Sequence, residues 1–322
     1  MVETEFKGPC DMVRETCDKV AAISKQVSLN QAKIEEFCKE LASKPKTAEY
    51  TSWRDCTFHF FDAARQDAVV DYVFIMDSLN FCFWQSDWEY EHLATNLKNT
   101  LMKDYEVLKP KNLVKMTFEF FQQSIFPGKP DFPLIKERYR IVREMGAMCL
   151  KYYDGEFVNV VKAAKESAQE LVEILTRTFP NFRDHAIYEG NQIFLYKRVQ
   201  ILVGDLWGAF EGKDYGKFND IDKLTMFPDY RVPQILVEVG IFEYSEDAKE
   251  IIKNKKEIPS GSKLEVEIRA NTVVAVERIR ETLAKEGIKY TAVEVDWLLW
   301  QKGEAVKDEI FPHHRVLTIF YQ

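Results

Sequence analysis

The chain has 322 residues, of which 44 are basic and 52 acidic, so its formal net charge is −8. Proteins that hold duplex nucleic acid neutralise its phosphates with a basic surface, so this charge argues against such a partner. A single phosphate remains easy to accommodate. The apolar content is 46%, and no apolar run approaches the roughly 20 residues that span a bilayer. We therefore expect a globular protein that binds neither duplex nucleic acid nor a membrane.

The N-terminus and the cysteines indicate an intracellular protein. No basic segment followed by an apolar stretch opens the chain, so we expect no signal peptide. The cysteines lie in the first half of the chain and never form a CxxC pair; they are Cys10, Cys17, Cys38, Cys56, Cys82 and Cys149. Reduced, mostly buried thiols in the cytoplasm are the simplest interpretation. Because no heptad or interface stripe is readable, we expect a monomer.

Helical spacing of apolar residues predicts two helical runs within residues 9–42, with a break at Lys44-Pro45-Lys46. Short strands are predicted at 57–61 (TFHFF) and 80–84 (NFCFW). Between them, the apolar positions of residues 69–79 fit a helix. This part of the chain therefore predicts a small β element among helices.

The middle of the chain is predicted to be helix-rich. Two helices are expected in residues 87–121, on either side of Lys109-Pro110, and residues 124–133 (SIFPGKPDFP) form the clearest internal break. Further helices are expected at 162–178 and 190–210.

Two later helices are predicted at 233–239 and 265–285, ended by Gly240 and Gly287. The tail, residues 315–321, alternates weakly and predicts either a strand or the extension of a helix. The fold class is therefore mainly α with a small β element.

The segment 71–84 (DYVFIMDSLNFCFW) surrounds polar residues with large aromatic ones. The polar cluster that the aromatic residues surround is Asp77, Ser78 and Asn80. A buried carboxylate must be paired, hydrogen-bonded or protonated. A flat ligand with polar edges, such as a nucleobase, would stack on Phe81 and Trp84 and present its edges to the polar residues. The alternative is a core segment whose polar groups cap a helix end.

Residues 224–236 (LTMFPDYRVPQIL) indicate a tight turn between helices, with Pro233 in the first turn of the second helix. Asp229 lies at the mouth of that helix, either as its N-cap or as a functional carboxylate. The unit resembles the helix-hairpin-helix of DNA glycosylases. The hairpin glycines that bind a DNA phosphate in those enzymes are replaced here by Pro228, Asp229 and Tyr230. The resemblance therefore points to a fold and not to DNA binding.

Several long segments together resemble one family, the queuosine salvage proteins, which are queuosine or queuosine 5′-phosphate N-glycosylases. The segments are MDSLNFCFW (76–84), PLIKERYRI (133–141), YDGEFVN (153–159), FRDH (182–185), YKRVQILVGDLW (196–207), LTMFPDYRVPQIL (224–236), EVEIRANTVVAVE (265–277) and VDWLLW (295–300). The resemblance implies hydrolysis of the N-glycosidic bond and release of queuine for reuse in tRNA.

The resemblance also implies a helical architecture like that of helix-hairpin-helix DNA glycosylases. We expect residues 1–322 to form a single compact unit, with an N-terminal part (1–125) that carries the β element and a helical glycosylase-like part (126–322). No cofactor is expected, and the scattered histidines predict no metal site. The rival hypothesis is a non-catalytic protein that binds a modified nucleobase or nucleotide.

N-glycoside hydrolysis develops positive charge on the ribose, so the site needs a carboxylate near the anomeric carbon and a positioned water. Asp229 is the first candidate, because a helix mouth favours its ionised form. Lys197 either orients this carboxylate, holds a 5′-phosphate, or is a solvated surface lysine. Asp205 would lie about 80° from Lys197 around the same helix, so both could face one cleft.

The remaining candidates are residues that could bind the base, the sugar or the phosphate of the substrate. Asp77 and Asn80 suit the N–H donors of a guanine-like edge. Asp296 could meet the cationic arm of queuosine, or could form a buried ion pair with Arg269 or Arg278. Tyr230 and Arg231 follow Asp229 directly, and are predicted to contact the sugar or phosphate.

Overall fold

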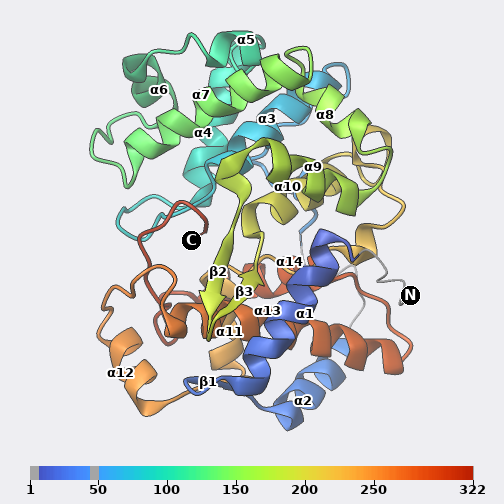
Figure 1. Cartoon of the computed structure of the whole chain (residues 1–322), viewed down its shortest axis with the longest axis vertical. Coiled ribbons are helices and arrows are strands. Elements are labelled where there is room, and N and C mark those ends of the chain that lie inside the picture. Colours follow the sequence, from blue (N-terminus) through green and yellow to red (C-terminus); the bar gives the residue numbers. More distant parts are fainter. Residues whose placement is uncertain (1–6, 44–50, 322) are drawn as a thin grey trace. The chain divides into compact units, whose positions relative to one another are not determined.

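The computed structural model describes residues 7–43 and 51–321 (Figure 1). These residues divide into two units, each with its own core. The first unit comprises residues 7–43, 184–197 and 220–317, and the second comprises 51–183, 198–219 and 318–321. Within the described residues, fourteen α-helices dominate the structure, and the β structure is limited to two antiparallel pairs of short strands. The prediction of a mainly α fold with a small β element is confirmed.

The first unit is built around one long helix. Its helices are α1 (Pro9–Ile23), α2 (Gln31–Ala42), α11 (Arg231–Glu238), α12 (Glu246–Lys253), α13 (Lys263–Lys285) and α14 (Ala292–Val306), with a 3-10 turn at Ile221–Lys223. Strand β1 (Val27–Leu29) pairs with β4 (Phe242–Tyr244), and β2 (His185–Tyr188) pairs with β3 (Asn191–Phe194). Helix α13 packs against α1, α2, α11 and α14 and is buried around most of its circumference (Figure 1).

A buried carboxylate ties the strands of this unit to α13. Glu267 Oε2 accepts hydrogen bonds from the backbone N–H groups of Lys25, Gln26 and Val27 at 2.9, 2.6 and 3.2 Å. Its Oε1 accepts a hydrogen bond from the Tyr188 hydroxyl group at 2.8 Å. The turn before β1 and the end of β2 are therefore both fixed to one side chain of the central helix.

Replacement of this carboxylate should weaken the first unit. In Glu267→Gln the amide nitrogen has to face hydrogen-bond donors, so at least one buried N–H or hydroxyl group loses its acceptor. We expect the free energy of unfolding to fall by about 1–3 kcal/mol. Urea unfolding of the two proteins measures the difference. An unchanged midpoint would show that these hydrogen bonds contribute nothing to stability.

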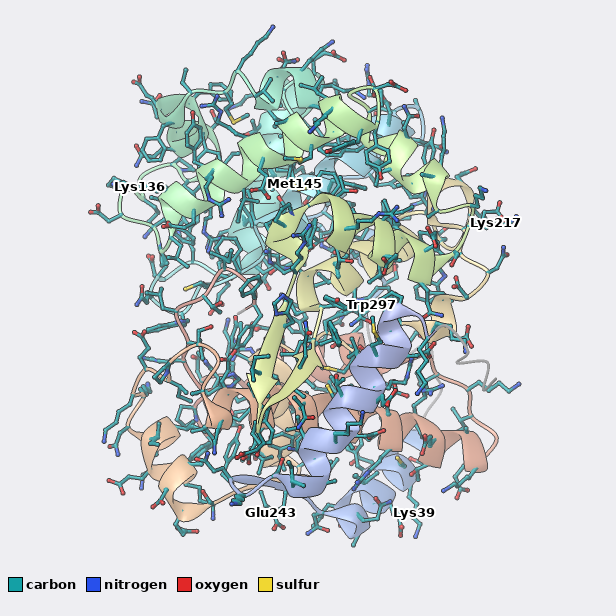
Figure 2. The ribbon with its side chains drawn as sticks, viewed as in Figure 1. Lys39, Lys136, Met145, Lys217, Glu243 and Trp297 are labelled. Atoms are coloured by element: carbon teal, nitrogen blue, oxygen red, sulfur yellow. The ribbon has the colours of Figure 1, made fainter. Side chains whose placement is uncertain are left out.

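The described residues of the second unit form helices joined by turns and irregular segments, without a β-strand. Its helices are α3 (Gln66–Ser78), α4 (Tyr90–Lys103), α5 (Pro110–Leu113), α6 (Phe118–Ile125), α7 (Ile135–Tyr152), α8 (Phe157–Ala163), α9 (Ala168–Thr178) and α10 (Lys197–Ala209, of which Lys197 belongs to the first unit), with 3-10 turns at Trp53–Asp55, Pro180–Phe182 and Asp214–Gly216. Helix α3 is buried from Ala68 to Ser78 and packs against α4, α7 and α8. Met145 of α7 lies among the buried side chains, whereas Lys136 of the same helix and Lys217 reach the surface (Figure 2).

Most of the predicted helices are confirmed. Helices α1 and α2 lie within residues 9–42, α3 covers most of 69–79, and α11 and α13 match the two later predictions. Gly240 and Gly287 follow α11 and α13 with φ of 73° and 79°, the left-handed conformation that glycine favours after a helix. The break predicted at Lys44-Pro45-Lys46 lies outside the described residues.

The two predicted strands are wrong. Residues 57–61 form turns, because the His59 ring stacks on Trp53 at 3.9 Å and is hydrogen-bonded to the Trp53 carbonyl oxygen. Residues 80–84 follow α3 as an irregular segment, and Cys82 has a φ of 46°. The carbonyl oxygens of this segment bind an arginine side chain, as described below, and so do not form a ladder.

Three helix predictions are corrected. Residues 87–121 contain α4, α5 and the start of α6, because Pro110 opens a short helix of its own. The helix expected at 162–178 is divided, since Lys165 and Glu166 have positive φ and the Ser167 hydroxyl then caps α9. The helix expected at 190–210 begins only at Lys197.

The residues before that helix form a hairpin that the periodicity did not predict. Strands β2 and β3 are joined by Glu189 and Gly190, both with positive φ, as in a two-residue hairpin turn. The tail at 315–321 forms neither a strand nor a helix and contributes one isolated bridge, between Arg315 and Glu257. None of the described helices is both long and apolar enough to cross a membrane.

Candidate functional site

Asp229 lies in the loop that leads into α11. Its Oδ1 atom accepts hydrogen bonds from the backbone N–H groups of Arg231 and Val232 at 3.1 and 2.9 Å. Asp229 therefore caps the helix, as one of the two interpretations predicted. The side chain is nevertheless buried, with 6% of its surface exposed. Oδ1 accepts both of these hydrogen bonds, so the cap does not use the second carboxylate oxygen, Oδ2.

The charge of Asp229 is controlled by opposing effects. Burial raises the pKa of its carboxyl group, while the positive charge of Lys197 is the largest influence in the other direction. The hydrogen bond from Val232 and the charge of Arg231 also lower this pKa, and Glu304 raises it. The net shift is upward. Asp229 is thus a desolvated carboxylate whose ionised form depends on a nearby lysine, and the structure brings the two predicted catalytic residues together.

Lys197 is the first residue of α10 and is buried, so it is not a solvated surface lysine. Its backbone N–H donates to Asp184 Oδ2 at 3.0 Å. Asp184 in turn forms a two-point ion pair with Arg269, with Nη1–Oδ1 and Nη2–Oδ2 distances of 2.9 and 2.6 Å. Arg269 Nε donates to the carbonyl oxygen of Pro228, the residue before Asp229, at 3.0 Å. The Asp184–Arg269 ion pair therefore connects the backbone at Lys197 with the loop that carries Asp229.

Asp296 holds the same loop from another side. Its Oδ1 atom accepts the backbone N–H of Phe227 at 3.0 Å. Of the two partners considered for Asp296, Arg269 forms its two-point pair with Asp184. Phe227 lies two residues before Asp229 along the chain, so this hydrogen bond from Asp296 shapes the loop whatever else Asp296 binds.

Tyr230 and Arg231 pack beside Asp229. The Arg231 guanidinium lies 4.8 Å from the centre of the Tyr230 ring, and its Nε donates to Glu304 at 2.5 Å. On the other side, the His313 ring lies 4.6 Å from the Tyr230 ring. Burial lowers the pKa of His313 to about 4, so this imidazole is neutral at neutral pH. These contacts show a packing role for Arg231; its predicted contact with sugar or phosphate stays a prediction.

The second group of predicted residues lies in the second unit, at the C-terminal end of α3. Asp77, Ser78 and Asn80 are buried, and Trp84 is partly exposed. The Ser78 hydroxyl donates to the Ile75 carbonyl oxygen at 2.9 Å, inside the last turn of the helix. The polar residues therefore do lie at a helix end, as the core interpretation expected.

Two buried arginines hold this end of α3. Arg138 of α7 donates to the carbonyl oxygens of Leu79, Phe81 and Cys82, the last at 2.9 Å. Arg198 donates to the Ser78 carbonyl oxygen at 2.5 Å. Positive groups are favourable where a helix ends, because they meet its unpaired carbonyl groups.

Phe81 lies between the same two arginines. Its ring centre is 4.0 Å from the Arg138 guanidinium carbon and 5.1 Å from that of Arg198. The side chain is fully buried. These contacts describe a cation–π role for Phe81 in the core. Trp84 is partly exposed, and its stacking on a base stays a prediction.

Asp77 of α3 and Asp205 of α10 share one neighbourhood. Both are buried, and the negative charges of both add to the effect of burial in raising the pKa of Tyr72 and of Tyr90. The structure thus brings together two predicted acids that lie 128 positions apart in the sequence. Within the described residues, no group of three or more His, Cys, Asp or Glu side chains is placed to hold a metal ion.

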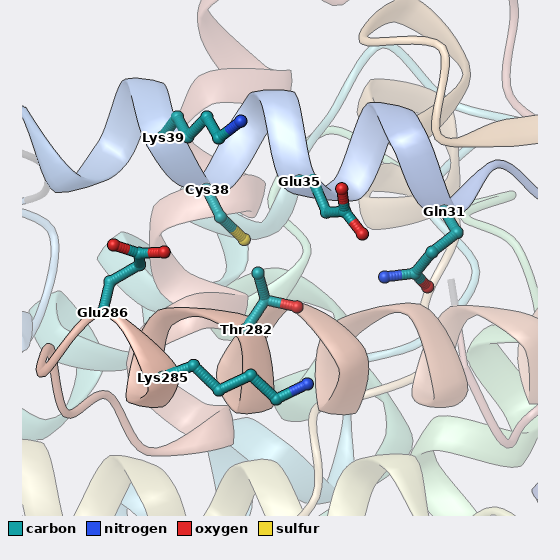
Figure 3. A pocket seen from close by; sticks show the side chains of 7 residues that line it. All are labelled: Gln31, Glu35, Cys38, Lys39, Thr282, Lys285 and Glu286. Carbon is teal, nitrogen blue, oxygen red and sulfur yellow. The ribbon is translucent and has the colours of Figure 1, made fainter.

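A pocket of about 200 Å³ lies elsewhere in the first unit, between α2 and α13 (Figure 3). Its lining residues are Gln31, Glu35, Cys38, Lys39, Thr282, Lys285 and Glu286. The Cys38 thiol points between the helices, and burial raises its pKa to about 11, so it is not a thiolate at neutral pH. Acidic and basic residues are equal in number along the wall, and no predicted site residue is among them.

Sequence comparison identifies the family. A profile described as "Queuosine salvage protein" matches residues 58–321. The chain belongs to this family. A Dictyostelium discoideum protein named queuosine 5′-phosphate N-glycosylase/hydrolase is 44% identical over 323 residues, covering 98% of this chain and 100% of the relative. Proteins of the same name from Sphaerobacter thermophilus and Bos taurus are 41% and 32% identical, over 80% and 96% of this chain and 82% and 98% of the relatives.

The match to the queuosine salvage proteins includes every candidate residue, from Asp77 to Asp296. It also includes four structural participants that were not singled out from the sequence as site residues: Arg138, Asp184, Arg198 and Arg269. Each lies in a segment that carried the family resemblance, PLIKERYRI, FRDH, YKRVQILVGDLW or EVEIRANTVVAVE. One acid and three arginines in those segments were the available signal.

Proposed function

We propose that this queuosine salvage protein hydrolyses the N-glycosidic bond of queuosine 5′-phosphate, or of queuosine, and so releases queuine for reuse in tRNA. The observation that carries the proposal is the 44% identity, over the full length of the relative, to a protein named for that activity. The buried Asp229, with Lys197 as a charge partner, supplies the kind of group that the reaction needs.

In the proposed reaction, a water oxygen bonds to the anomeric carbon as the bond from that carbon to the base nitrogen breaks. The bonding electron pair leaves with the base, whose nitrogen takes up a proton from solvent, and the attacking water loses one, so protons and charge balance. The ribose carries positive charge in the transition state, and a carboxylate held in a water-poor site stabilises it more than one in bulk water. Ionised Asp229 is assigned this role, together with acceptance of the water proton.

Queuine places a further demand on the site. As a 7-deazapurine it has no nitrogen at position 7 to protonate, so the simplest activation of a purine leaving group is absent. More of the barrier must then be lowered by stabilising the sugar cation. Lys197 is proposed to keep Asp229 ionised, because its charge is the largest influence that lowers the carboxyl pKa. A direct contact between Lys197 and a 5′-phosphate is the alternative role.

The remaining assignments are part of the same proposal. Asp77 and Asn80 are proposed to recognise the base edge, with Ser78, Phe81 and Trp84 shaping their surroundings. Asp205 and Asp296 are further candidate acids, and Tyr230 and Arg231 are candidates for contact with sugar or phosphate. The architecture is proposed to be a variant of the helix-hairpin-helix glycosylases. Its first hairpin helix is reduced to the 3-10 turn at Ile221–Lys223, and α11 is the second. We further propose a cytoplasmic monomer without a cofactor.

The proposal is tested by following release of free queuine from queuosine 5′-phosphate and from queuosine by chromatography. Guanosine 5′-phosphate is the matched control substrate, because it has the same sugar phosphate and a different base. We expect turnover of at least one queuosine substrate and none of the control. Tight binding of both queuosine compounds without any release would overturn the proposal.

The pH dependence of kcat/KM should show the upward-shifted pKa of Asp229. The ionised carboxylate is the active form, so activity should fall as the pH is lowered through this pKa. We expect the acid limb to lie above the ordinary aspartate value of 3.8, because burial outweighs the charges of Lys197 and Arg231. Initial rates at subsaturating substrate, measured in buffers of constant ionic strength, give the profile. An acid limb at or below pH 3.8 would contradict the assignment of Asp229.

A further inference from the structure

We propose that Asp184 and Arg269 form a positioning pair that fixes Asp229 and Lys197 relative to each other. The inference rests on the proposed function, because it assumes that these two residues act on the substrate. Neither Asp184 nor Arg269 is expected to touch the substrate, since their charged groups bind each other, the Lys197 N–H and the Pro228 carbonyl oxygen.

Arg269 contributes a rigid connection. Its guanidinium is planar, and all three of its nitrogens are engaged: Nη1 and Nη2 with the Asp184 carboxylate, and Nε with the Pro228 carbonyl oxygen. Because these donors have fixed directions, the carboxylate and the carbonyl group cannot move independently. Pro228 directly precedes Asp229, so the position of Arg269 in α13 determines where the loop enters α11.

Asp184 fixes the segment that leads to Lys197. Its side chain accepts the backbone N–H of Lys197, and its own carbonyl oxygen accepts the N–H groups of Leu195 and Tyr196, both at 3.1 Å. Three consecutive N–H groups thus converge on one residue. Tyr196 has a φ of 52°, a left-handed conformation that a bulky side chain adopts only when its surroundings require it. Asp184 therefore fixes the backbone of residues 195–197, from which the Lys197 side chain extends.

Stability alone gives little reason for such a pair. A buried ion pair has to overcome the cost of removing both charges from water, and apolar residues of similar size often support a fold equally well. Catalysis is more demanding, because a displacement of about 1 Å in a reacting group can cost roughly 100-fold in rate. The pair joins two segments that carry proposed catalytic groups, which is a function that apolar residues cannot replace.

The test separates folding from positioning. In the double variant Asp184→Leu/Arg269→Met both charges of the pair are removed together. Glu265, whose carboxylate lies 3.7 Å from Arg269, keeps its hydrogen bond from the Gly261 N–H. In Arg269→Lys a single ammonium group cannot reach both the carboxylate and the Pro228 carbonyl in the original geometry. Glu267→Gln is the matched control, since it perturbs a buried charged residue of the same helix, two positions away, that holds other segments. Each protein is measured for kcat, KM, thermal unfolding and the pH profile of kcat/KM.

We expect the double variant and Arg269→Lys to remain folded and to lose roughly 100-fold in kcat, with KM for queuosine 5′-phosphate changed by less than about threefold. Their acid limb should move to higher pH, because Lys197 no longer holds Asp229 in its ionised form as effectively. The control should lose stability while its kcat stays within about threefold of the wild type.

Several outcomes would overturn the inference: a folded double variant with wild-type kcat, an effect confined to KM, or an equal loss of kcat in Glu267→Gln. If Arg269→Lys fails to fold, the double variant still decides. Failure of the proposed function looks different, because the wild type would then release no queuine, or Asp229→Asn would remain as active as the wild type.

Discussion

Asp229→Asn should reduce kcat for queuine release by roughly 100- to 10,000-fold, the usual range for loss of a general acid or base. The substitution removes the negative charge that stabilises the ribose cation and the group that accepts the water proton. Its shape and its Oδ1 acceptor are retained, so the hydrogen bonds from Arg231 and Val232 that cap α11 can still form. Single-turnover measurements on queuosine 5′-phosphate, with enzyme in excess, isolate the chemical step.

The stability of this variant provides its control. A carboxyl group whose pKa is raised by folding stabilises the protein fully only below its unfolded pKa, and this stabilisation is lost as the pH rises through the folded pKa. Ionised Asp229 therefore opposes folding at neutral pH. We expect Asp229→Asn to be at least as stable as the wild type there, as is common where a functional group is held in an unfavourable site. An inactive variant that is also markedly unfolded would not support a catalytic role. A stable variant that remains fully active would move the role to Asp205 or Asp296.

Local sequence signals predicted the parts of the fold that depend on neighbouring residues. The spacing of apolar residues and the glycines beyond the helix ends were sufficient for α11 and α13. The hairpin of β2 and β3 also had a local signal, because Glu189-Gly190 lies between two short runs that include apolar residues. The apolar residues after Gly190 favour a helix over 190–210 instead, so their spacing does not predict the hairpin.

The parts that were predicted wrongly depend on distant residues. The alternation of apolar residues in NFCFW is typical of a strand, yet its carbonyl groups bind Arg138, which lies more than 50 positions away. Similarly, Asp229 and Lys197 could be chosen from their motifs, whereas the pairing of Asp184 with Arg269 spans 85 positions. No local spacing contains that information, because any of several acids could have reached Arg269.

The largest effect on stability is expected for Arg138→Met. This side chain is fully buried and donates to three carbonyl oxygens of the segment after α3. Burial lowers the pKa of its guanidinium to about 9, which still leaves it charged at neutral pH. Methionine fills part of the volume but donates no hydrogen bond, so three carbonyl groups lose the arginine as a donor, while the Leu79 oxygen still accepts the Phe81 N–H. We expect the free energy of unfolding to fall by about 3–5 kcal/mol, measured by urea unfolding.

Arg140→Met is the matched control, because Arg140 lies two residues further along α7, is exposed, and forms an ion pair with Glu144 on the same helix surface. A surface pair of this kind contributes little, so the control should unfold close to the wild-type midpoint. Arg138→Lys adds a second comparison. The lysine ammonium group keeps the charge but cannot reach all three carbonyl groups in the geometry of the guanidinium. The stability of this variant should therefore lie between those of Arg138→Met and the wild type. Equal stability of Arg138→Met and Arg140→Met would show that the segment after α3 keeps its conformation without the arginine. In that case the aromatic residues around it, and not its hydrogen bonds, would determine the path of the chain from Leu79 to Cys82.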